Sequence, residues 1–498
     1  MKSRTYSQIT IILILSNLIM HSYYIKMEPK SIIKCDRKRS NPINQILINN
    51  NDWSPGTNLN DKFNRYESNL NQISQNSKFS RNSQRKDDLS QQIDNFLSNQ
   101  KSNSSLSKSP TNLSQNKFPI DAVYTWVNGK DEKWVKLFKE ATAKKRHYVN
   151  REMFAARFED NDELRYSLRT LEKYAKFFRY IHIVTYDGNG PKWMNISHPK
   201  IRMVSHSQIF TKHGIDPLFD ELIAKASLPL FNSNAIEVAL CNVPDLAEHF
   251  VYLNDDCFFG KKVKRSTFFN ENGIPQIFTF YKDFHRAEVD YLTGISRYQN
   301  RDNNNGYQFV TSIHFTVKEF QQKMREILNQ KYKLNSEINE NISYYTNEIS
   351  AHVAFPSTKT LWRLSMSFLC KDVQETLSHQ TRSISDVQIQ TLIIQYGKLH
   401  GFVNTIMVKD ESDLARFIVV ENECSLDRVL LIYQYPPLVF SINIDSPRLR
   451  SHITGFFQDF VPNPSGFEIE EFFPKKSRIG TKYWKRVRSR MMIRRRCY

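Results

Sequence analysis

The chain has 498 residues, of which 40% are hydrophobic and 13% aromatic, so it is long enough for two ordinary domains or one large domain with appendages. Its formal net charge is +19, but eleven Lys or Arg and no acid lie in 475–498, so the excess is mainly a property of the C-terminal segment. Six cysteines lie far apart without CxxC spacing, so they indicate neither a zinc cluster nor a small disulfide framework, and one or two disulfide bridges would form only in the secretory lumen.

The N-terminal segment carries Lys2 and Arg4 ahead of an apolar run at 9–20. A basic start, an apolar run and no small-residue cleavage site are typical of an uncleaved signal anchor. We therefore predict a transmembrane segment at 1–30 with a cytoplasmic N-terminus; the alternative is a buried helix. Residues 31–117 are rich in Asn, Ser, Gln and Lys and are predicted to form a disordered stem.

Order is expected to begin at Phe118, with a strand in IDAVYTWVNG (120–129) that an Asn-Gly turn closes. Asp121 at the start of this strand could be a solvated edge residue. An amphipathic helix is predicted at 162–178, with Asp160 or Asn161 as its cap. Arginines near the start of this helix, Arg165 among them, suit either a phosphate pocket or a solvated face.

Further strands and a helix are predicted in alternation, at 181–185, 201–204, 232–247 and 250–254. This alternation is typical of a parallel α/β sheet. The last strand runs into Asp255 and Asp256, which would deliver two carboxylates to the edge where such sheets bind nucleotides and where magnesium is held beside phosphate. The alternative is an ordinary turn cap. Glu237, near the start of the helix, either faces the same edge or is a surface acid that the helix dipole favours.

Beyond residue 270 the pattern is looser. Helices are predicted at 317–328 and 451–460, and the polar stretch 330–350 is predicted to be an insertion. His314 precedes the first of these helices. A lone histidine is more often a structural residue than a ligand or a base.

Together these stretches resemble the Stealth family of hexose-1-phosphate transferases, and they are similar to the N-acetylglucosamine-1-phosphotransferase α/β precursor type. The resemblance is carried by 120–129, 157–169, 181–195, 235–237 and 250–260. It extends over about 118–473, which we predict to be the catalytic domain, followed by a basic tail at 474–498.

The later family regions depart from the pattern. Thr316 stands where the family has a proline two places after its histidine, which His314 would match. Arg363 resembles the later family arginine. The usual Asn-Asp core of the fourth region instead reads Glu421-Asn422-Glu423.

The resemblance implies a glycosyltransferase-A-like α/β core that binds a nucleotide-sugar and carries added helical segments. It implies transfer of a sugar-1-phosphate, GlcNAc-1-phosphate from UDP-GlcNAc, to a hydroxyl of a glycan such as a mannose, with release of UMP. Such phosphoryl transfer needs cationic charge on the diphosphate and a base for the hydroxyl.

The resemblance also implies roles for residues. The predicted catalytic residues are Glu237, Asp256, His314 and Arg363. The predicted substrate-binding residues are Asp121, Asn161 and Arg165. Asp255 and Asp256 would hold Mg²⁺ or Mn²⁺, and which carboxylate or histidine acts as the base stays open.

Two other functions compete with this one: a metal-dependent glycosyltransferase that releases UDP, and an inactive Stealth-like binding protein. Nucleic-acid binding by the tail is not predicted, because no nucleic-acid module stands beside it. With the signal anchor, the resemblance implies a single-pass type II protein of the Golgi membrane with a lumenal catalytic domain. Its partners would be a UDP-sugar and a high-mannose glycoprotein or a phosphoglycan; the oligomeric state, a homodimer among the options, is not given.

Overall fold

The computed structural model describes residues 118–474, apart from 144–157, 159, 212–219, 221, 225, 283, 285–289, 293–304, 333–345 and 410–411, together with 483–484. The predicted anchor (1–30), the predicted stem (31–117) and most of the basic tail lie outside the described residues. The predicted single-pass membrane anchoring is contradicted within the described ranges, where no helix combines the length and the apolar character needed to cross a bilayer, and nothing supports the predicted Golgi placement.

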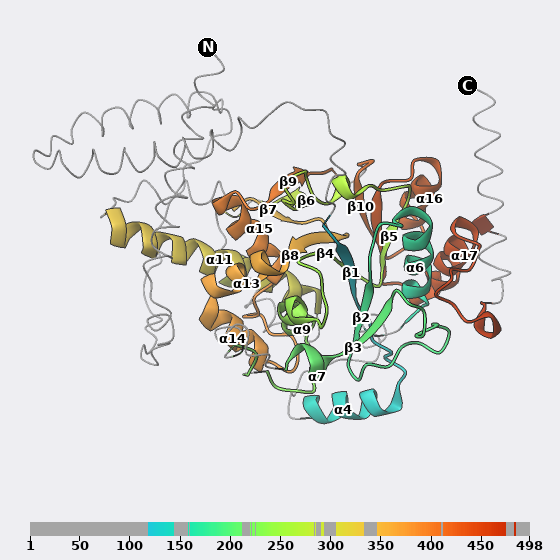
Figure 1. Ribbon diagram of the computed structural model, residues 1–498, viewed down its shortest axis with the longest axis horizontal. Coiled ribbons are helices and arrows are strands. Elements are labelled where there is room, and N and C mark those ends of the chain that lie inside the picture. The colour runs from blue at the N-terminus through green and yellow to red at the C-terminus, as the bar shows by residue number, and fades with distance from the viewer. Residues whose placement is uncertain are drawn as a thin grey trace, which may run out of the picture. The chain divides into compact units, whose positions relative to one another are not determined.

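A five-stranded sheet in the order β3-β2-β1-β4-β8 forms the centre of the structure (Figure 1). Its strands are β1 (Ile120–Thr125), β2 (Ile181–Thr185), β3 (Ile201–Ser205), β4 (His249–Asn254) and β8 (Phe355–Thr358). The first four are parallel, and β8 runs antiparallel to β4. The order 3-2-1-4 is that of a nucleotide-binding α/β sheet. The predicted α/β fold with a nucleotide-sugar-binding type of core is therefore confirmed.

The central strands are buried on both faces, as expected for parallel strands covered by helices. In β1, Val123 packs into one hydrophobic core, with Phe250 and Tyr252 of β4. Ala122 and Tyr124 pack into the other core, which also includes residues of α6 (Glu163–Tyr174). Alternate residues thus serve opposite layers, because successive side chains of a strand point to opposite faces.

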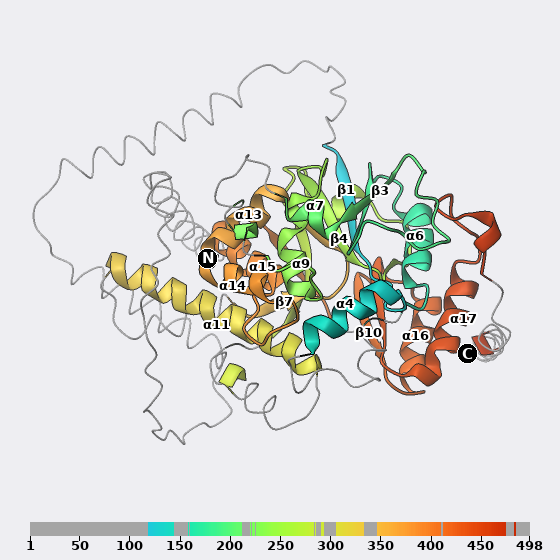
Figure 2. The ribbon, with the colours of Figure 1, turned by 90° about the horizontal axis from the view of Figure 1, so that it is seen from below.

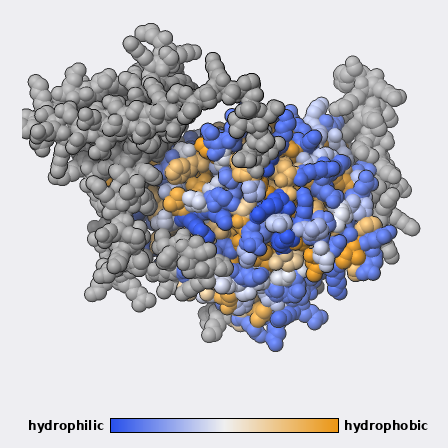
Figure 3. All heavy atoms as spheres, viewed as in Figure 1, coloured by the Kyte–Doolittle hydropathy of each residue, from blue (hydrophilic) through white to orange (hydrophobic). Residues whose placement is uncertain are grey.

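The helices cover the sheet from two sides. Figures 1 and 2 show α6 on one side and α9 (Ser233–Val238), α13 (Lys359–Phe368) and α15 (Ile389–His400) on the other. The remaining helices with described bounds are α4 (Glu132–Thr142), α7 (His206–Ile209), α11 (Asn305–Tyr332), α14 (Cys370–Ser378), α16 (Ser425–Gln434) and α17 (Arg450–Phe460). Hydrophilic and hydrophobic side chains are interspersed on the face seen in Figure 3.

Two three-stranded sheets flank the main one. The first has the order β10-β11-β5, from Ala415–Val420, Val439–Ile444 and Cys257–Phe259. The second has the order β7-β6-β9, from Glu348–Ser350, Gln276–Tyr281 and Asn404–Met407. Because β5 follows β4 directly, the Asp255-Asp256 turn joins the main sheet to the first of these.

Three predicted helices have different bounds in the structure. The helix expected at 162–178 ends at Tyr174, because Ala175 leaves the helical conformation at φ −131° and ψ 49°. The helix expected at 232–247 ends earlier, since Val243 precedes Pro244 and takes an extended ψ of 129°. The helix expected at 317–328 begins already at Asn305, so His314 is helical.

The basic tail packs against the folded part of the chain at one described position. Trp484 is fully buried, and its Nε1 donates to the carbonyl oxygen of His452 at 2.6 Å. Its ring contacts those of Phe456 and Tyr433. This part of the tail therefore packs on α17 and α16.

Candidate active site

A cavity of about 320 Å³ lies at the carboxyl edge of the main sheet, where nucleotide ligands of α/β folds bind. It is lined by residues that directly follow four neighbouring strands: Trp126 and Val127 after β1, Tyr186 after β2, His206 after β3, and Asp255 and Asp256 after β4. The end of β11 adds Asn443 and Ile444, and α9 adds Ser233, Ile236 and Glu237. Because the parallel strands all end at this edge, residues from distant segments of the chain line one cavity, which we call the edge pocket.

Glu237 lies on α9 and lines the edge pocket. Asn232 caps the start of this helix, because the Asn232 side chain accepts a hydrogen bond from the backbone N–H of Asn234. The carboxylate is 5% exposed and accepts from Gln390 Nε2 at 3.4 Å. Burial raises the pKa of Glu237, and the positive charges of Arg382 and His352 oppose this shift. A carboxyl group with a raised pKa binds a proton more readily than an ordinary, solvated glutamate.

The acidic turn after β4 is the second part of the site. Burial, and then the charges of Glu163 and Asp256, raise the pKa of Asp255 well above its usual range. Burial and neighbouring carboxylates also raise the pKa of Asp160 to about 6 and that of Glu163 to about 7. Negative charge is therefore crowded at this corner, and a bound cation would relieve it.

Asn161 lies in this corner and lines the edge pocket. Its backbone N–H and its side-chain amide both donate to the Glu163 carboxylate, at 2.6 and 2.8 Å. The predicted cap at Asp160 or Asn161 is wrong, because the residue before α6 is Asp162 in the left-handed region at φ 65°, with no side-chain cap bond. Asp160 instead accepts from the Asp162 backbone and from Trp126 Nε1.

His352 is a lining residue that the sequence did not reveal. Its Nε2 lies 3.7 Å from Oδ2 of Asp256. Burial acts to lower the pKa of His352, but its interaction with the Asp256 carboxylate, and then the charge of Glu237, outweigh it and raise the pKa. The imidazole is thus favoured as a cation.

Arg382 is the second lining residue that the sequence did not reveal. Its Nε and Nη2 both donate to Oγ of Ser233, at 3.0 and 2.6 Å. The guanidinium also lies 5.4 Å from the ring centroid of Phe309. A fixed guanidinium next to Glu237 gives the edge pocket a planar anion-binding group.

The predicted catalytic residues His314 and Arg363 are not among the side chains that line the edge pocket. His314 is buried on α11, edge-on to the ring of Phe284, and burial lowers its pKa. Arg363 belongs to α13. The structure therefore brings together Glu237 and Asp256, with Asp255 and Asn161, but leaves this histidine and this arginine apart from them.

Asp121 lies at the opposite end of β1 from the edge pocket. Its fully buried carboxylate accepts from Arg179 at 2.6 and 2.9 Å, from the backbone N–H of Ala247 at 2.8 Å, and meets His182 Nε2 at 3.2 Å. Although burial acts to raise it, these partners hold the pKa of Asp121 well below its usual range. The geometry is that of a structural contact between strands.

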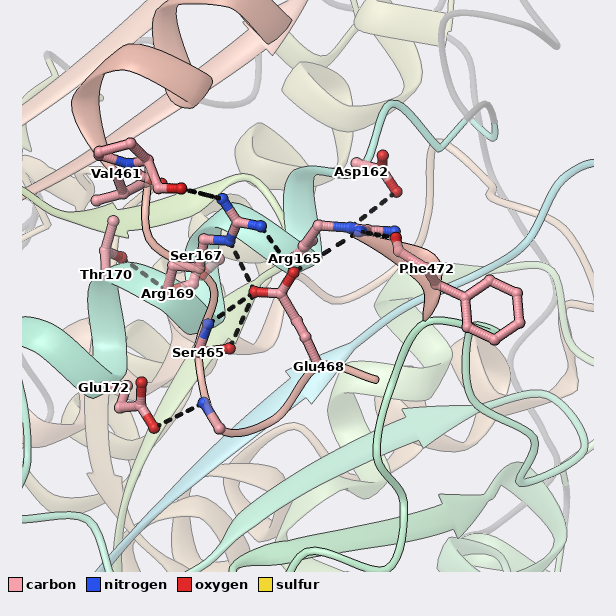
Figure 4. Close-up of polar contacts among 12 residues, drawn as sticks. Asp162, Arg165, Ser167, Arg169, Thr170, Glu172, Val461, Ser465, Glu468 and Phe472 are labelled. Atoms are coloured by element: carbon pink, nitrogen blue, oxygen red, sulfur yellow. Dashed lines mark hydrogen bonds and ion pairs between the residues drawn. The ribbon is translucent and has the colours of Figure 1, made fainter. Parts of the chain in front are cut away.

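Arg165 is not among the residues that line the edge pocket, and Figure 4 shows it beside Glu468 and Phe472. Its Nη1 donates to the carbonyl oxygen of Phe472 at 2.7 Å and lies 3.6 Å from Glu468, and its guanidinium stacks 4.7 Å from the ring centroid of Trp193. These contacts attach the segment after α17 to the start of α6.

Within the described residues, no group of three or more His, Cys, Asp or Glu side chains is arranged to hold a metal ion. Magnesium at sites of phosphate chemistry usually takes only one or two carboxylates, with phosphate oxygens and water completing its shell. The adjacent carboxylates of Asp255 and Asp256 fit that donor set, and a bound cation would favour the ionised form of Asp255 against its burial.

Two family models match the chain: Stealth protein conserved region 1 at residues 118–146 and conserved region 2 at 157–277. Glu237, Asp255, Asp256 and Asn161 lie in the second match, and His352 and Arg382 lie beyond both.

A capsular polysaccharide phosphotransferase of Haemophilus influenzae is 30% identical over 299 residues, which cover 59% of this chain and 68% of that protein. An exopolysaccharide phosphotransferase of Streptomyces coelicolor is 46% identical over 162 residues, 32% of this chain and 25% of that protein. The match thus spans only a quarter of the length of the Streptomyces relative. Among solved structures, mouse xyloside xylosyltransferase 1 aligns with 65% of this chain and 98% of its own, at 10% identity and a TM-score of 0.29. With both regions matched and two thirds of the Haemophilus protein covered, the chain belongs to the Stealth family.

Proposed function

We propose that the chain transfers a sugar-1-phosphate from a UDP-sugar to a hydroxyl group of a glycan and releases UMP. The observation that carries this proposal is the meeting of Glu237, Asp256, His352 and Arg382 around one cavity at the nucleotide edge of the sheet. The relatives are polysaccharide phosphotransferases by name, which supports transfer of a sugar phosphate to a glycan. UDP-GlcNAc and a mannose hydroxyl are the donor and acceptor that we propose to test first.

The diphosphate would lie between the acidic turn and Arg382. Asp255 and Asp256 would hold Mg²⁺ or Mn²⁺, which supplies positive charge to the diphosphate oxygens. Arg382, fixed by Ser233, would bind the transferred phosphate through its planar N–H groups. Protein and ion charge together would stabilise the charge that develops on the phosphoryl oxygens.

Glu237 would act as the base. The acceptor oxygen attacks the β-phosphorus, its proton passes to the Glu237 carboxylate, and the bond from that phosphorus to the bridging oxygen breaks. His352, held as a cation beside Asp256, would stabilise the negative charge on the departing UMP. The product is a glycan phosphodiester. Residues 118–473 would form the catalytic domain of this enzyme.

The test incubates the full chain with UDP-GlcNAc, Mg²⁺ or Mn²⁺, and α-methylmannoside, and identifies the nucleotide that is released. We expect UMP together with a GlcNAc-phosphate-mannoside. The Glu237→Gln variant should lose activity by about 10²- to 10⁴-fold, the range for general acid–base groups. Glu375→Gln, an exposed carboxylate on α14, is the matched control.

The outcome distinguishes the competing functions. Release of UDP would identify a glycosyltransferase that leaves the phosphate on the nucleotide. Nucleotide binding without turnover, over a panel of UDP-sugars and glycan acceptors, would identify a binding relative.

A further inference from the structure

A second cavity, of about 680 Å³, lies between the later part of α6 and the loop that follows α17. One wall is formed by α6 and the turn after it, with Glu172, Lys173 and Lys176, and a second by His198 and Lys200 before β3. The third is the Pro462–Phe467 loop. We call this space the basic groove. Its volume falls in the range of small-molecule sites, about 300–1,000 Å³.

The groove presents positive charge. Lys173 and Lys176 are exposed and Lys200 is half-buried. Lys200 Nζ donates to the carbonyl oxygen of Phe178 at 2.9 Å and lies 3.5 Å from that of Lys176, which fixes the ammonium group and leaves further donor capacity for a ligand. Lys173 also lies in the last turn of α6, where a cation suits the helix dipole, so helix stability alone accounts for that one charge.

The acids beside the groove are already engaged. Glu172, the one acid among its described lining residues, accepts from the backbone N–H of Gly466 at 3.0 Å. The buried Glu468 accepts from Arg169 Nε and Nη2, both at 2.7 Å, and from the backbone N–H of Ser465 at 2.9 Å (Figure 4). The charge of Glu468 is therefore paired with Arg169, whereas Glu172 keeps its charge beside an uncharged N–H donor. Three lysines and one unneutralised acid line the groove, so its net charge is positive.

The wall is rigid and partly apolar. Arg169 Nη1 also donates to the carbonyl oxygen of Val461 at 3.1 Å, so one guanidinium holds both ends of the loop against α6. Exposed Pro462 and Pro464, with Phe467 beneath, offer apolar faces to the groove. Ammonium groups beside apolar faces suit a ligand with both phosphate and sugar-ring surfaces, and a preformed wall lowers the ordering cost of binding it.

The groove and the edge pocket are connected by a single helix. Glu163 at the start of α6 lines the edge pocket, and Lys173 lines the groove ten residues later, roughly 15 Å along the helix axis at 1.5 Å per residue. A glycan chain of a few sugars could therefore extend from one to the other.

We propose that the basic groove binds a glycan phosphodiester, the acceptor chain or the product of the reaction proposed above. This inference rests on the proposed function for the identity of the ligand, because transfer of a sugar-1-phosphate to a hydroxyl makes a phosphodiester. An enzyme that binds its own anionic product next to the site would favour acceptors that already carry phosphate.

The test measures binding of a fluorescent mannotriose that bears GlcNAc-1-phosphate on its terminal O6, against the same mannotriose without the phosphate. We expect the full chain to bind the phosphorylated probe more tightly, with an affinity that falls as salt rises. The variant Lys173→Gln/Lys176→Gln/Lys200→Gln should bind it roughly tenfold more weakly, since each exposed charge contact is modest. The charge-matched control Lys323→Gln/Lys371→Gln/Lys409→Gln changes exposed lysines on other elements and should bind as the unaltered chain.

Three outcomes would overturn the proposal: equal binding of the phosphorylated and neutral probes, an equal loss in the control variant, or equally tight binding of a single-stranded 12-mer DNA. Turnover of α-methylmannoside, which is too short to reach the groove, should be unchanged in the groove variant. That assay separates the two proposals, because binding of the probe is read without turnover.

Discussion

His352 Nε2 lies 3.7 Å from Asp256 Oδ2, although the two residues belong to segments that are far apart in the sequence. Asp256 follows β4, and His352 follows β7 with a positive φ of 49°. The backbone of His352 is fixed by Ser441 of β11, whose Oγ donates to its carbonyl oxygen at 2.5 Å. All three sheets thus contribute to the position of one imidazole.

We predict that His352→Gln lowers kcat by about 10²- to 10³-fold while nucleotide binding changes little, because the cation acts mainly on charge that develops during transfer. His314→Gln is the matched control, since His314 does not line the edge pocket. Steady-state kinetics and calorimetric titration with UDP measure the two effects. A larger loss in His314→Gln than in His352→Gln would contradict the geometry.

The pH dependence follows from the same pair. Because the pKa of His352 is raised in the folded protein, its stabilising charge is fully present below the ordinary histidine value of about 6.5 and is lost as pH rises through the raised value. Burial raises the pKa of Glu237, so the base is lost as pH falls through that value. We predict a bell-shaped profile of kcat/KM whose alkaline limb disappears in His352→Gln. An unchanged alkaline limb in that variant would assign the limb to another group.

Arg382 and Arg363 give a second matched comparison. We predict that Arg382→Lys lowers kcat/KM by roughly 10- to 100-fold, because an ammonium cannot reproduce two N–H bonds from one planar group. Arg363→Lys should stay within about twofold, as expected for a side chain away from the reacting groups. Initial rates of both variants at several donor concentrations measure the two values of kcat/KM. If Arg363→Lys is the more damaged variant, phosphate binding belongs to α13.

Much of the core was predictable because it follows local rules. The strands near 120, 181, 201 and 250 show runs of apolar and β-branched residues, and the edge rule for parallel strands places Asp255 and Asp256 at a ligand site. Glu237 was predictable for the same reason, since α9 begins at that edge. The order of strands and helices along the chain is enough to predict the sheet and these three carboxylates at its edge.

The remaining site residues were not predictable in this way. His352 and Arg382 lie in connections between elements, where no periodicity indicates the direction of a side chain. His314 was predicted from the family resemblance, which gave no indication of His352. Asp121 was misleading for another reason: it lies on a central strand, but at the amino end, where Arg179 and His182 occupy its oxygens.

Asp386 is expected to position two parts of the edge pocket, the start of α9 and the turn that carries Arg382. Its buried carboxylate accepts from the side-chain amides of Asn232 and Asn234 at the start of α9, at 2.9 and 3.2 Å. It also meets His379 Nδ1 at 2.8 Å and accepts from the Ser383 backbone at 2.8 Å, which fixes the turn that carries Arg382. We predict that Asp386→Asn lowers kcat more than it changes KM.

Asp386→Asn should also lower the free energy of unfolding by about 3 kcal/mol, because a buried charge partner is lost. Denaturant unfolding and steady-state kinetics on the same protein measure both effects. Asp372→Asn on α14 is the control for substitution of an acid in this region. Unchanged kcat with lowered stability would make Asp386 a purely structural residue.

Asp121 provides the opposite case, an acid that we expect to matter for stability and not for substrate. Because its folded pKa is depressed, its contribution is present above the ordinary aspartate value of about 3.9 and is lost as pH falls toward the depressed value. Asp121→Asn should cost about 3 kcal/mol of unfolding free energy at pH 7, since it leaves Arg179 without its charge partner and removes the buried carboxylate that the Ala247 N–H also bonds. The difference in unfolding free energy between Asp121→Asn and the unaltered chain should shrink below pH 4, because the stabilising contribution of the Asp121 carboxylate decreases there. At a temperature where both proteins are folded, KM for the UDP-sugar should be equal within about twofold. A raised KM with unchanged stability would instead place Asp121 in the substrate site.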